Sequence, residues 1–427
     1  MLTIDRLFNG VVLVAPLLVG ALLTGVIFAG EEGSPLPITV FQLAFICSFM
    51  LLVAKKVIDG EVEIHIYGLE SYYLLFLCLI FLSITYTPDR EEALLIAFRF
   101  IALLIMTYVV FNTIDTPSQL KWVCIIAVVT ALAIATYNLL AIYINPQIAA
   151  FNFASQGGKL VRSSGGELDP NIFASNYFLP LMLLITLFCK SDTFKIRMLI
   201  FVCIGVIVGS VLLTYSRSSW VSIFFGAVCV MYFTKDFRLV IYMGIAFMIA
   251  FSISGAVQQL TFSFLERLVD IFAGSSDDSS KFRILLAVTA IYMIFDSYLL
   301  GVGFRGFSTE FKSYHPPETT QGIFEPHNEY YAVFAELGLI GFVIFIALLA
   351  KIFRTAIQSI RESDSESDMH VISIALFATF VSYLVFYNFL GGMLVNSILF
   401  ILIGLIFVVN KLIADKTTNT QKVIDSL

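Results

Sequence analysis

Long apolar runs recur along the whole of this 427-residue chain and restrict its fold more than any other feature. A helix needs about 20 mostly apolar residues to cross a bilayer, where its backbone groups must bond to one another. Hydrophobic residues make up 59% of the sequence and charged residues only 13%, whereas a soluble domain carries roughly one quarter charged residues. We therefore predict an all-α integral membrane protein. The runs interpreted as helices are Val11–Ala29, Ile38–Ala54, Ser71–Tyr86, Ala93–Asn112, Leu120–Ile144, Asn171–Cys189, Met198–Ser216, Ser218–Phe233, Leu239–Val257, Gly338–Phe353, Val371–Leu390 and Met393–Asn410.

These runs predict about twelve transmembrane helices in a single polytopic domain covering residues 1–427. We interpret the first run as a retained helix, because no small-residue cleavage site stands out before Glu31-Glu32. All six cysteines fall within or at the ends of apolar runs, so neither a disulfide framework nor a metal site is indicated. The net charge of -6 comes without a basic tract. We therefore expect membrane lipids, and no nucleic acid, among the partners.

The lysines and arginines indicate an orientation. With the N-terminus in the cytoplasm, 15 of the 25 basic residues fall on the inner side and nine on the outer side, with Arg99 inside a helix. The positive-inside rule favours this arrangement. Residues 258–337 then form one large extracytoplasmic loop between helices nine and ten, and we expect it to carry part of the active site. A loop of that length should contain helices, and Thr261–Phe272 has suitable spacing.

The segment Phe282–Leu300 tests this topology. It is apolar enough to span a membrane, but Asp296 interrupts it. Counting it as a span would place His327 in the cytoplasm and the lysine-bearing C-terminal tail outside, against the charge bias. We therefore predict an outer-face or re-entrant helix here.

A first polar cluster follows the fifth predicted helix, where Arg162 precedes Asp169, Pro170 and Asn171. Asp suits a helix N-cap and Pro a first helical turn. A helix start after a flexible glycine loop therefore accounts for these residues by itself. A second interpretation, in which this cluster binds a ligand through Arg162, stays open beside it.

A second cluster surrounds Arg217, in a tight polar break between two apolar runs. The runs need nearly all the neighbouring residues to span, so the turn is short and Arg217 stays near the membrane surface. An arginine there can snorkel to lipid headgroups. We favour binding to the phosphate of a lipid-linked substrate, because a guanidinium can form two parallel hydrogen bonds to it.

A third cluster comprises Arg283 and, after an apolar stretch, Gly301-Val302-Gly303-Phe304-Arg305. Glycines at this spacing let a backbone turn sharply or approach a ligand closely. No strand precedes them, so neither a Rossmann nor a P-loop motif is indicated. Lys281 lies two residues from Arg283 and could take its place as a phosphate ligand.

The fourth cluster is Pro326-His327-Asn328, at the mouth of the helix that follows. Histidine has an ordinary pKa of about 6.5, so a neutral imidazole can accept a proton near neutral pH. Asn328 is a suitable helix cap, and helical counting from His327 brings Tyr331, Phe334 and Gly338 onto one face. Arginines on the same side of the membrane would add an anion site next to a base.

In the order and spacing of these clusters the chain resembles the superfamily of O-antigen ligases and Wzy-type O-antigen polymerases, from about Arg162 to Gly341. The residues that carry the resemblance are Arg162 followed by Asp169-Pro170-Asn171, Ser216-Arg217, Arg283 ahead of Gly301-Val302-Gly303, and His327-Asn328 with nine residues before Gly338-Leu339-Ile340-Gly341.

The resemblance implies a glycosyltransferase of the bacterial inner membrane with its active site facing the periplasm. The donor would be a glycan on undecaprenyl diphosphate, and the acceptor a sugar hydroxyl on lipid A–core or on another lipid-linked glycan. Transfer would invert the anomeric configuration without a metal. The general base would be His327, and Arg217 and Arg283 would bind and stabilise the leaving diphosphate. The residues expected to contact substrate are Arg162, Asp169, Asn171, Arg305, Asn328 and Tyr331.

No cofactor and no metal are expected. Fixed guanidinium groups in a low-dielectric site can stabilise a departing diphosphate much as a metal would. The set that could ligate a metal consists of His315, Glu325, His327 and Glu329, and the sequence contains no Asp-X-Asp motif.

Other functions remain to be compared with O-antigen ligation, which we favour slightly. A Wzy-type O-antigen or exopolysaccharide polymerase would use the same donor. A polysaccharide flippase or transporter needs charges deep in its spans, and Arg99 is almost the only charged residue inside the predicted helices. A cell-wall glycan polymerase uses the same carrier, but its acidic catalytic loop has no clear equivalent in this sequence.

Overall fold

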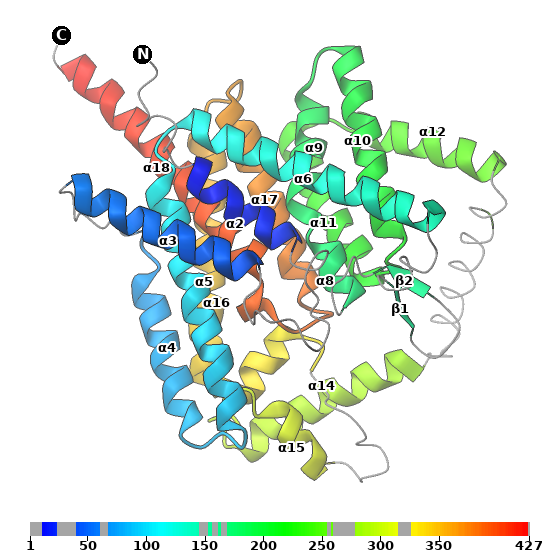
Figure 1. Cartoon of the computed structure of the whole chain (residues 1–427). Helices are drawn as coiled ribbons and strands as arrows, with labels where there is room; N and C mark the ends of the chain where they lie inside the picture. The colour runs from blue at the N-terminus through cyan, green and yellow to red at the C-terminus, as the bar shows by residue number, and fades with distance from the viewer. Residues whose placement is uncertain are drawn as a thin grey trace.

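The computed structural model describes residues 11–23, 40–59, 67–144, 153–155, 161–163, 169–253, 258, 278–314 and 326–425. Nearly all of this part is helical (Figure 1). The helices are α2 Val11–Leu23, α3 Val40–Asp59, α4 Glu70–Ile84, α5 Arg90–Thr113, α6 Pro117–Ile144, α8 Pro170–Ser175, α9 Phe178–Lys190, α10 Phe194–Leu212, α11 Arg217–Thr234, α12 Arg238–Ile253, α14 Asp278–Asp296, α15 Phe307–Tyr314, α16 Glu329–Glu362, α17 Asp368–Phe386, the 3-10 turn η2 Met393–Val395 and α18 Ser397–Asp425.

The helical membrane fold predicted from the sequence is confirmed. Among the described residues, seven helices are long and apolar enough to cross a membrane, and two shorter apolar helices, Phe45–Ala54 and Glu70–Ile84, accompany them. A total of about twelve spans stays a prediction. The seven segments are Arg90–Thr113, Pro117–Leu140, Pro170–Lys190, Phe194–Leu212, Glu329–Glu362, Asp368–Phe386 and Ser397–Lys416.

Polar caps set the start of several helices. Asp89 accepts a hydrogen bond from the Glu92 N–H at 3.0 Å and begins α5. Ser367 accepts from the His370 N–H at 3.3 Å and begins α17. Each side chain satisfies a backbone N–H that has no partner within the helix, which is why these helices begin where the hydrophobic run meets a short polar residue.

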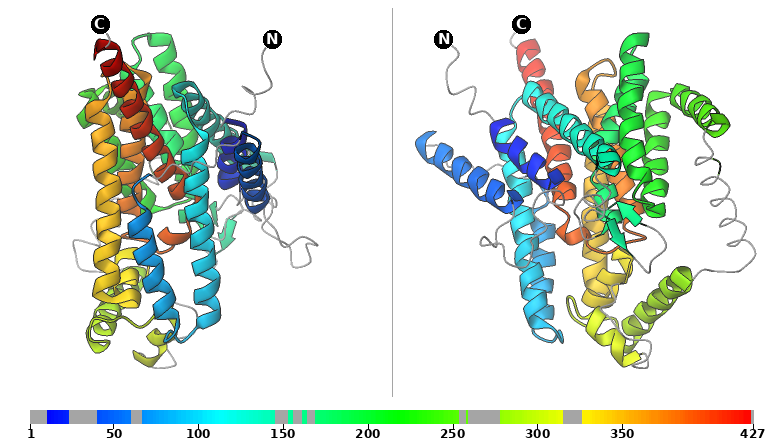
Figure 2. Two further views of the ribbon diagram at one scale, coloured as in Figure 1. Left: turned by 90° about the vertical axis from the view of Figure 1, so that its left-hand side faces the viewer. Right: turned by 45° about the vertical axis from the view of Figure 1, so that its right-hand side comes forward.

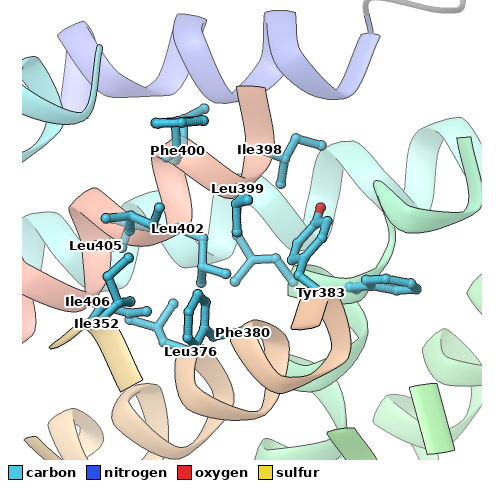
Figure 3. Packing of buried hydrophobic residues seen from close by; sticks show 14 of the residues in the cluster. Ile352, Leu376, Phe380, Tyr383, Ile398, Leu399, Phe400, Leu402, Leu405 and Ile406 are labelled. Atoms are coloured by element: carbon cyan, nitrogen blue, oxygen red, sulfur yellow. The ribbon is translucent and has the colours of Figure 1, made fainter. Parts of the chain in front are cut away.

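One hydrophobic core runs through the helices of the C-terminal half and joins them to α5 and α9. Figure 3 shows side chains of α17 and α18 meeting there with Ile352 of α16. The approach of α11 to α17 is close because Gly226 has no side chain. A Cβ at this position would lie against Ser382 Oγ, 2.9 Å from Met182 Sδ and 3.0 Å from the Ala378 carbonyl oxygen.

The long helices have two different ends. At one end, which we call the basic end, Lys121 pairs with Asp368 at 2.7 Å and Lys411 with Asp115 at 3.1 Å. Lys190 Nζ donates to the Ser365 carbonyl oxygen at 3.1 Å in the same region. The turn between α4 and α5 lies at the other end, beside α14 and α15 (Figure 2). There Thr87 Oγ1 donates to the Phe304 carbonyl oxygen at 2.8 Å.

Helix α16 folds back on itself at Gly338. The backbone of Gly338 is non-helical, with φ 67° and ψ -167°. The rings of Phe334 and Phe342 lie 4.8 Å apart, and those of Tyr330 and Phe345 lie 6.1 Å apart. In a straight helix the first pair would be separated by about 12 Å and the second by about 22 Å, since each residue rises about 1.5 Å. Residues 329–337 and 339–362 are therefore two antiparallel arms, which we call the α16 hairpin.

This hairpin changes the expected surroundings of His327. The prediction that Gly338 continues the helical face of Tyr331 and Phe334 is wrong, because the chain reverses there. Tyr330 lies beside Phe345, seven residues along the second arm from the turn. At about 1.5 Å per residue, the His327 end of the first arm lies about 10 Å inward from the turn. The first arm thus runs back alongside the second arm, toward the interior of the described helices.

Residues 282–296 of the segment Phe282–Leu300 lie in α14, Asp278–Asp296, which is absent from the candidate spans in the described part. Its buried face packs on α15 and on Ala335 of the hairpin. Tyr314 Oη donates to Asp296 Oδ2 at 2.9 Å. Burial and this hydrogen bond raise the pKa of Tyr314 to about 12, so the tyrosine keeps its proton at neutral pH. The helix expected over Thr261–Phe272 and most of the 258–277 segment lie outside the described residues.

Candidate functional site

Each of the three residues after His327 forms a hydrogen bond to a carbonyl oxygen at the end of α17. Asn328 Nδ2 donates to the Asn388 carbonyl oxygen at 3.1 Å. The Glu329 N–H donates to the Tyr387 carbonyl oxygen at 2.9 Å, and Tyr330 Oη donates to the Leu384 carbonyl oxygen at 2.8 Å. Helix α17 therefore holds the His327 segment at successive points and limits its freedom to move.

His327 itself has a left-handed backbone, with φ 48°. This region is uncommon for residues other than glycine and costs about 1–3 kcal/mol where a rigid surrounding imposes it. The side chain is half-buried. Directly after it, Asn328 caps α16 by accepting the Tyr331 N–H at 3.1 Å, as the sequence predicted. The fixed backbone gives the imidazole a defined place at the inner end of the hairpin.

Two tyrosines, Tyr383 and Tyr387, connect helix α8 to the His327 segment. Tyr383 Oη donates to the Ser175 carbonyl oxygen of α8 at 3.1 Å. The Tyr383 ring stacks on Tyr387 with centroids 6.0 Å apart, and the Tyr387 carbonyl receives the Glu329 N–H. The two tyrosines thus connect α8 to the His327 segment through the end of α17.

At the start of α8, the structure supports the helix-start interpretation of the first cluster. Asp169 Oδ1 accepts the Asn171 N–H at 2.6 Å and Asn171 Nδ2 at 2.8 Å, with Pro170 in the first turn. Arg162 lies in a short strand rather than a flexible loop: β2 Val161–Ser163 pairs antiparallel with β1 Phe153–Ser155. A ligand role for Arg162, Asp169 and Asn171 stays a prediction.

Arg217 occupies the first turn of α11, beyond a sharp turn from α10. Ser216 caps α11 by accepting the Ser219 N–H at 3.3 Å, and Tyr215 has a left-handed φ of 50°. Ser216 is buried whereas Arg217 is exposed. The predicted short turn between α10 and α11 is therefore present. Helix α8 contacts α11, which brings the first two clusters into one neighbourhood.

The glycines of the third cluster pack against other backbone rather than leaving a gap for a ligand. A Cβ on Gly301 would lie 2.5 Å from the Glu336 carbonyl oxygen, and one on Gly303 would lie 2.6 Å from Thr87 Cα. Both glycines have positive φ, 86° and 95°. The Gly303 N–H donates to the Glu336 carbonyl oxygen at 3.0 Å. This stretch therefore closes the turn of the α16 hairpin.

Arg305 joins this closure to α5. Its Nη2 donates to Glu92 Oε1 at 2.7 Å, and its backbone N–H donates to Glu336 Oε2 at 2.9 Å. Glu336 is buried, with 6% of its surface exposed. Both carboxylates fix Arg305 in place. A substrate contact of Arg305 stays a prediction beside this observed structural role.

Arg283 lies on α14, one turn before buried Leu286, and its side chain is exposed. Helix α14 packs on the α16 hairpin, which places Arg283 on an element in contact with the His327 arm. Tyr331 is also exposed, at 37% of its surface. Lys281 lies in α14 as well, so the choice between Lys281, Arg283 and Arg305 as main phosphate ligand stays open.

Across the described part of the chain, no group of three or more His, Cys, Asp and Glu side chains gathers as a metal site would require. Of the four residues considered for a metal, His315 and Glu325 lie outside the described residues. Arg99 is exposed on α5 rather than buried among helices.

Several residues at the site were not predicted from the sequence. Glu329 was considered only as a metal ligand, and Tyr383, Tyr387 and Gly392 were assigned to apolar runs or to the gap between them. A usable signal was the pair Gly391-Gly392, which separates two predicted helices. Glycines in such a place indicate a sharp or close backbone turn, and Gly392 indeed has φ 93°.

Fold and site together define a polytopic helical membrane protein with a histidine-bearing hairpin. Residues 199–346 match the O-antigen ligase family. This match confirms the resemblance of this segment to the O-antigen ligase superfamily that was found in the sequence. Arg217, Arg283, Arg305 and His327 all fall inside the matched segment, whereas Arg162 precedes it. A comparison with curated proteins found no match.

Proposed function

We propose that this protein transfers a glycan from an undecaprenyl-diphosphate-linked donor to a sugar hydroxyl, and that its principal reaction is ligation of O-antigen to lipid A–core. The family match over residues 199–346 carries the general part of this proposal, a ligase- or polymerase-type glycan transfer on a lipid-linked substrate. The position of His327, held at the inner end of the first arm of the α16 hairpin, supports its role as the base in this transfer.

His327 is the proposed general base. The imidazole takes the proton of the acceptor hydroxyl as its oxygen forms a bond to the anomeric carbon of the donor sugar. The bond from that carbon to the diphosphate breaks, and the diphosphate leaves with the electron pair. Attack from the face opposite the leaving group inverts the anomeric configuration. This step needs no metal if cationic side chains stabilise the departing charge.

Arg217 and Arg283 are the proposed phosphate ligands. Both guanidinium-bearing side chains are exposed at helix positions near the hairpin or α8, and guanidinium groups bind phosphate with paired, charge-assisted hydrogen bonds. Arg162, Asp169, Asn171, Arg305, Asn328 and Tyr331 are proposed to contact the glycan or the carrier. Asn328 and Arg305 also have the structural contacts described above.

The proposed location is the bacterial inner membrane, with the site facing the periplasm. Its support is the charge pattern: the ion pairs of Lys121 and Lys411 gather at the end opposite the α4–α5 turn. Under the positive-inside rule the basic end faces the cytoplasm. We further propose that residues 1–427 form one membrane domain and that 258–337 is its extracytoplasmic segment.

A polymerase of O-antigen or exopolysaccharide would use the same donor and differ in the acceptor. The glycan phenotype of a deletion strain separates the two. Full-length polymer accumulating on the lipid carrier supports a ligase. Single repeat units capping lipid A–core, with no polymer on the carrier, would contradict ligation and assign polymerisation.

Substitution of the base tests the mechanism. We expect His327→Ala to abolish transfer while the protein stays inserted at normal abundance, because the acceptor hydroxyl loses its proton acceptor. Arg217→Lys should reduce transfer at least about tenfold, since an ammonium cannot form the paired bonds of a guanidinium. Transfer is measured with purified protein and a lipid-linked donor. Near-normal activity of His327→Ala would refute the assignment of the base.

A further inference from the structure

The side chain of Glu329 makes a contact that the proposed chemistry does not require. Its Oε2 accepts the Gly392 N–H at 2.7 Å. Only 4% of the Glu329 surface is exposed, although a carboxylate is rarely buried without partners. Glu329 lies two residues from His327, and Gly392 lies in the connection between α17 and η2. The carboxylate therefore links the base-bearing arm to a segment that is distant in sequence.

Gly392 suits this contact. Its φ of 93° is a conformation that side chains rarely adopt, and it turns the chain into η2, where Gly392 is the N-cap residue. Figure 2 shows this connection part-way along the long helices rather than at the end where the α4–α5 turn lies. The segment 387–392 therefore runs next to the inner end of the α16 hairpin, which carries His327.

The arm does not depend on the Glu329 side chain for its attachment. Asn328 and Tyr330 bond to α17 through their own side chains, and Glu329 bonds to Tyr387 through its backbone N–H. Removing the carboxylate leaves these three bonds in place. Among the bonds described above, it removes the one between the carboxylate and the Gly392 N–H, which joins the 389–392 segment to the His327 arm.

We propose that Glu329 is a positioning residue that holds the 389–392 segment against the His327 arm and thereby sets the approach of the acceptor hydroxyl to the imidazole. This role rests on the proposed function of His327 as the base. A displacement of about 1 Å at a reacting centre can lower a rate by as much as about 100-fold. We therefore expect the loss of the Glu329 carboxylate to lower kcat rather than the affinity for the donor.

Three variants of Glu329 test the idea against a matched control. Glu329→Gln keeps an oxygen that can accept the Gly392 N–H, Glu329→Ala removes it, and Glu329→Asp keeps the charge but withdraws the oxygen by one methylene. Glu362→Gln changes an exposed carboxylate at the end of the second arm of the α16 hairpin. Purified full-length protein is assayed for kcat and for the donor KM, with abundance and Tm measured alongside.

We expect Glu329→Ala to lower kcat about tenfold or more with the donor KM changed less than about threefold. Glu329→Gln should stay within about threefold of the unaltered protein and exceed Glu329→Asp. The Glu362→Gln control should match the unaltered protein. If Glu329→Ala does not fold, the comparison of Glu329→Gln with Glu329→Asp is sufficient, and the positioning role requires the higher kcat for Glu329→Gln.

Two results would overturn the positioning role. The first is equal activity of Glu329→Ala and the unaltered protein. The second is a higher activity of Glu329→Asp than of Glu329→Gln, which would show that the effect depends on the negative charge rather than on the hydrogen bond to Gly392. His327→Ala is assayed in parallel. If His327→Ala is active, the proposed base fails whatever Glu329 does. If His327→Ala is inactive and Glu329→Ala is normal, only the positioning role fails.

Discussion

At the scale of single residues, glycines at sharp turns decide where the functional segments lie. Gly338 has φ 67° and ψ -167°, a combination found essentially only in glycine. A Cβ there would also lie against the Leu299 carbonyl oxygen and 2.5 Å from the Leu300 carbonyl carbon. The reversal that brings His327 back among the helices therefore depends on the absence of a side chain at this position.

Gly338→Ala should consequently destabilise the protein by about 3 kcal/mol, since it adds backbone strain and a clash with backbone atoms that cannot rotate away. The measurement is the Tm in detergent together with abundance in the membrane. Gly205→Ala in α10 is the control, because nothing lies within 4 Å of its Cβ position. An unchanged Tm for Gly338→Ala would show that the hairpin turn tolerates a side chain.

The sequence predicted some of these residues and not others, for physical reasons. Asn328 and Asp169 were identified as caps because capping depends on the residue and its immediate neighbours. The reversal at Gly338 was missed because glycine within an apolar run is compatible with a continuing helix. The contacts of Glu329 with Tyr387 and Gly392 join residues about 60 positions apart, and no local pattern indicates such a pairing.

At the scale of elements, the packing of α11 on α17 depends on small residues. In a bilayer, lipid tails are as apolar as leucine, so helices associate through close packing and hydrogen bonds rather than through the hydrophobic effect. Gly226 meets Ser382, Ala378 and Met182 of α17 and α9. These same helices carry Tyr383 and lead from α8, so their spacing affects the placement of the His327 arm.

We therefore expect Gly226→Val to destabilise the protein by about 2 kcal/mol, as overpacking of a tight interior does. Part of the glycan-transfer activity should be lost with it. Thermal unfolding monitored in detergent gives the first quantity and a transfer assay the second. Gly244→Val in α12, where no atom lies within 4 Å of the Cβ position, should leave both close to normal. Equal Tm values for the two variants would contradict the packing argument.

Hydropathy predicted which segments are helical better than it predicted where the chain reverses its direction. Run Ser71–Tyr86 corresponds to α4, and Leu239–Val257 to α12. Hydropathy records burial in an apolar medium but not whether a chain continues or turns back inside it. The sequence prediction therefore assigned the first arm of the α16 hairpin to a loop and the second arm to a helix. It also assigned residues of the short β1–β2 ribbon to a flexible loop.

At the scale of the whole molecule, the two ends of the helix bundle differ in the contacts that join their helices. The basic end carries ion pairs between helix ends, such as Lys121 with Asp368 and Lys411 with Asp115. At the opposite end, backbone hydrogen bonds join the 297–306 stretch to the hairpin turn, and the Thr87 hydroxyl joins the α4–α5 turn to the same stretch. If the basic end faces the cytoplasm, as proposed above from the positive-inside rule, an acceptor that approaches His327 from the periplasm would pass this end of the bundle or its flank.

A pair of cysteine substitutions tests that orientation. In a variant without the six native cysteines, Glu91→Cys places a thiol at the α4–α5 end and Glu366→Cys places one at the basic end, both at exposed positions. In intact cells with a permeabilised outer membrane, a membrane-impermeant thiol reagent should label the first and not the second. After the inner membrane is opened both should react, which shows that protection reflects the side of the membrane rather than burial. Labelling of Glu366→Cys alone in intact cells would invert the topology, place the arginines and His327 toward the cytoplasm and exclude a periplasmic reaction.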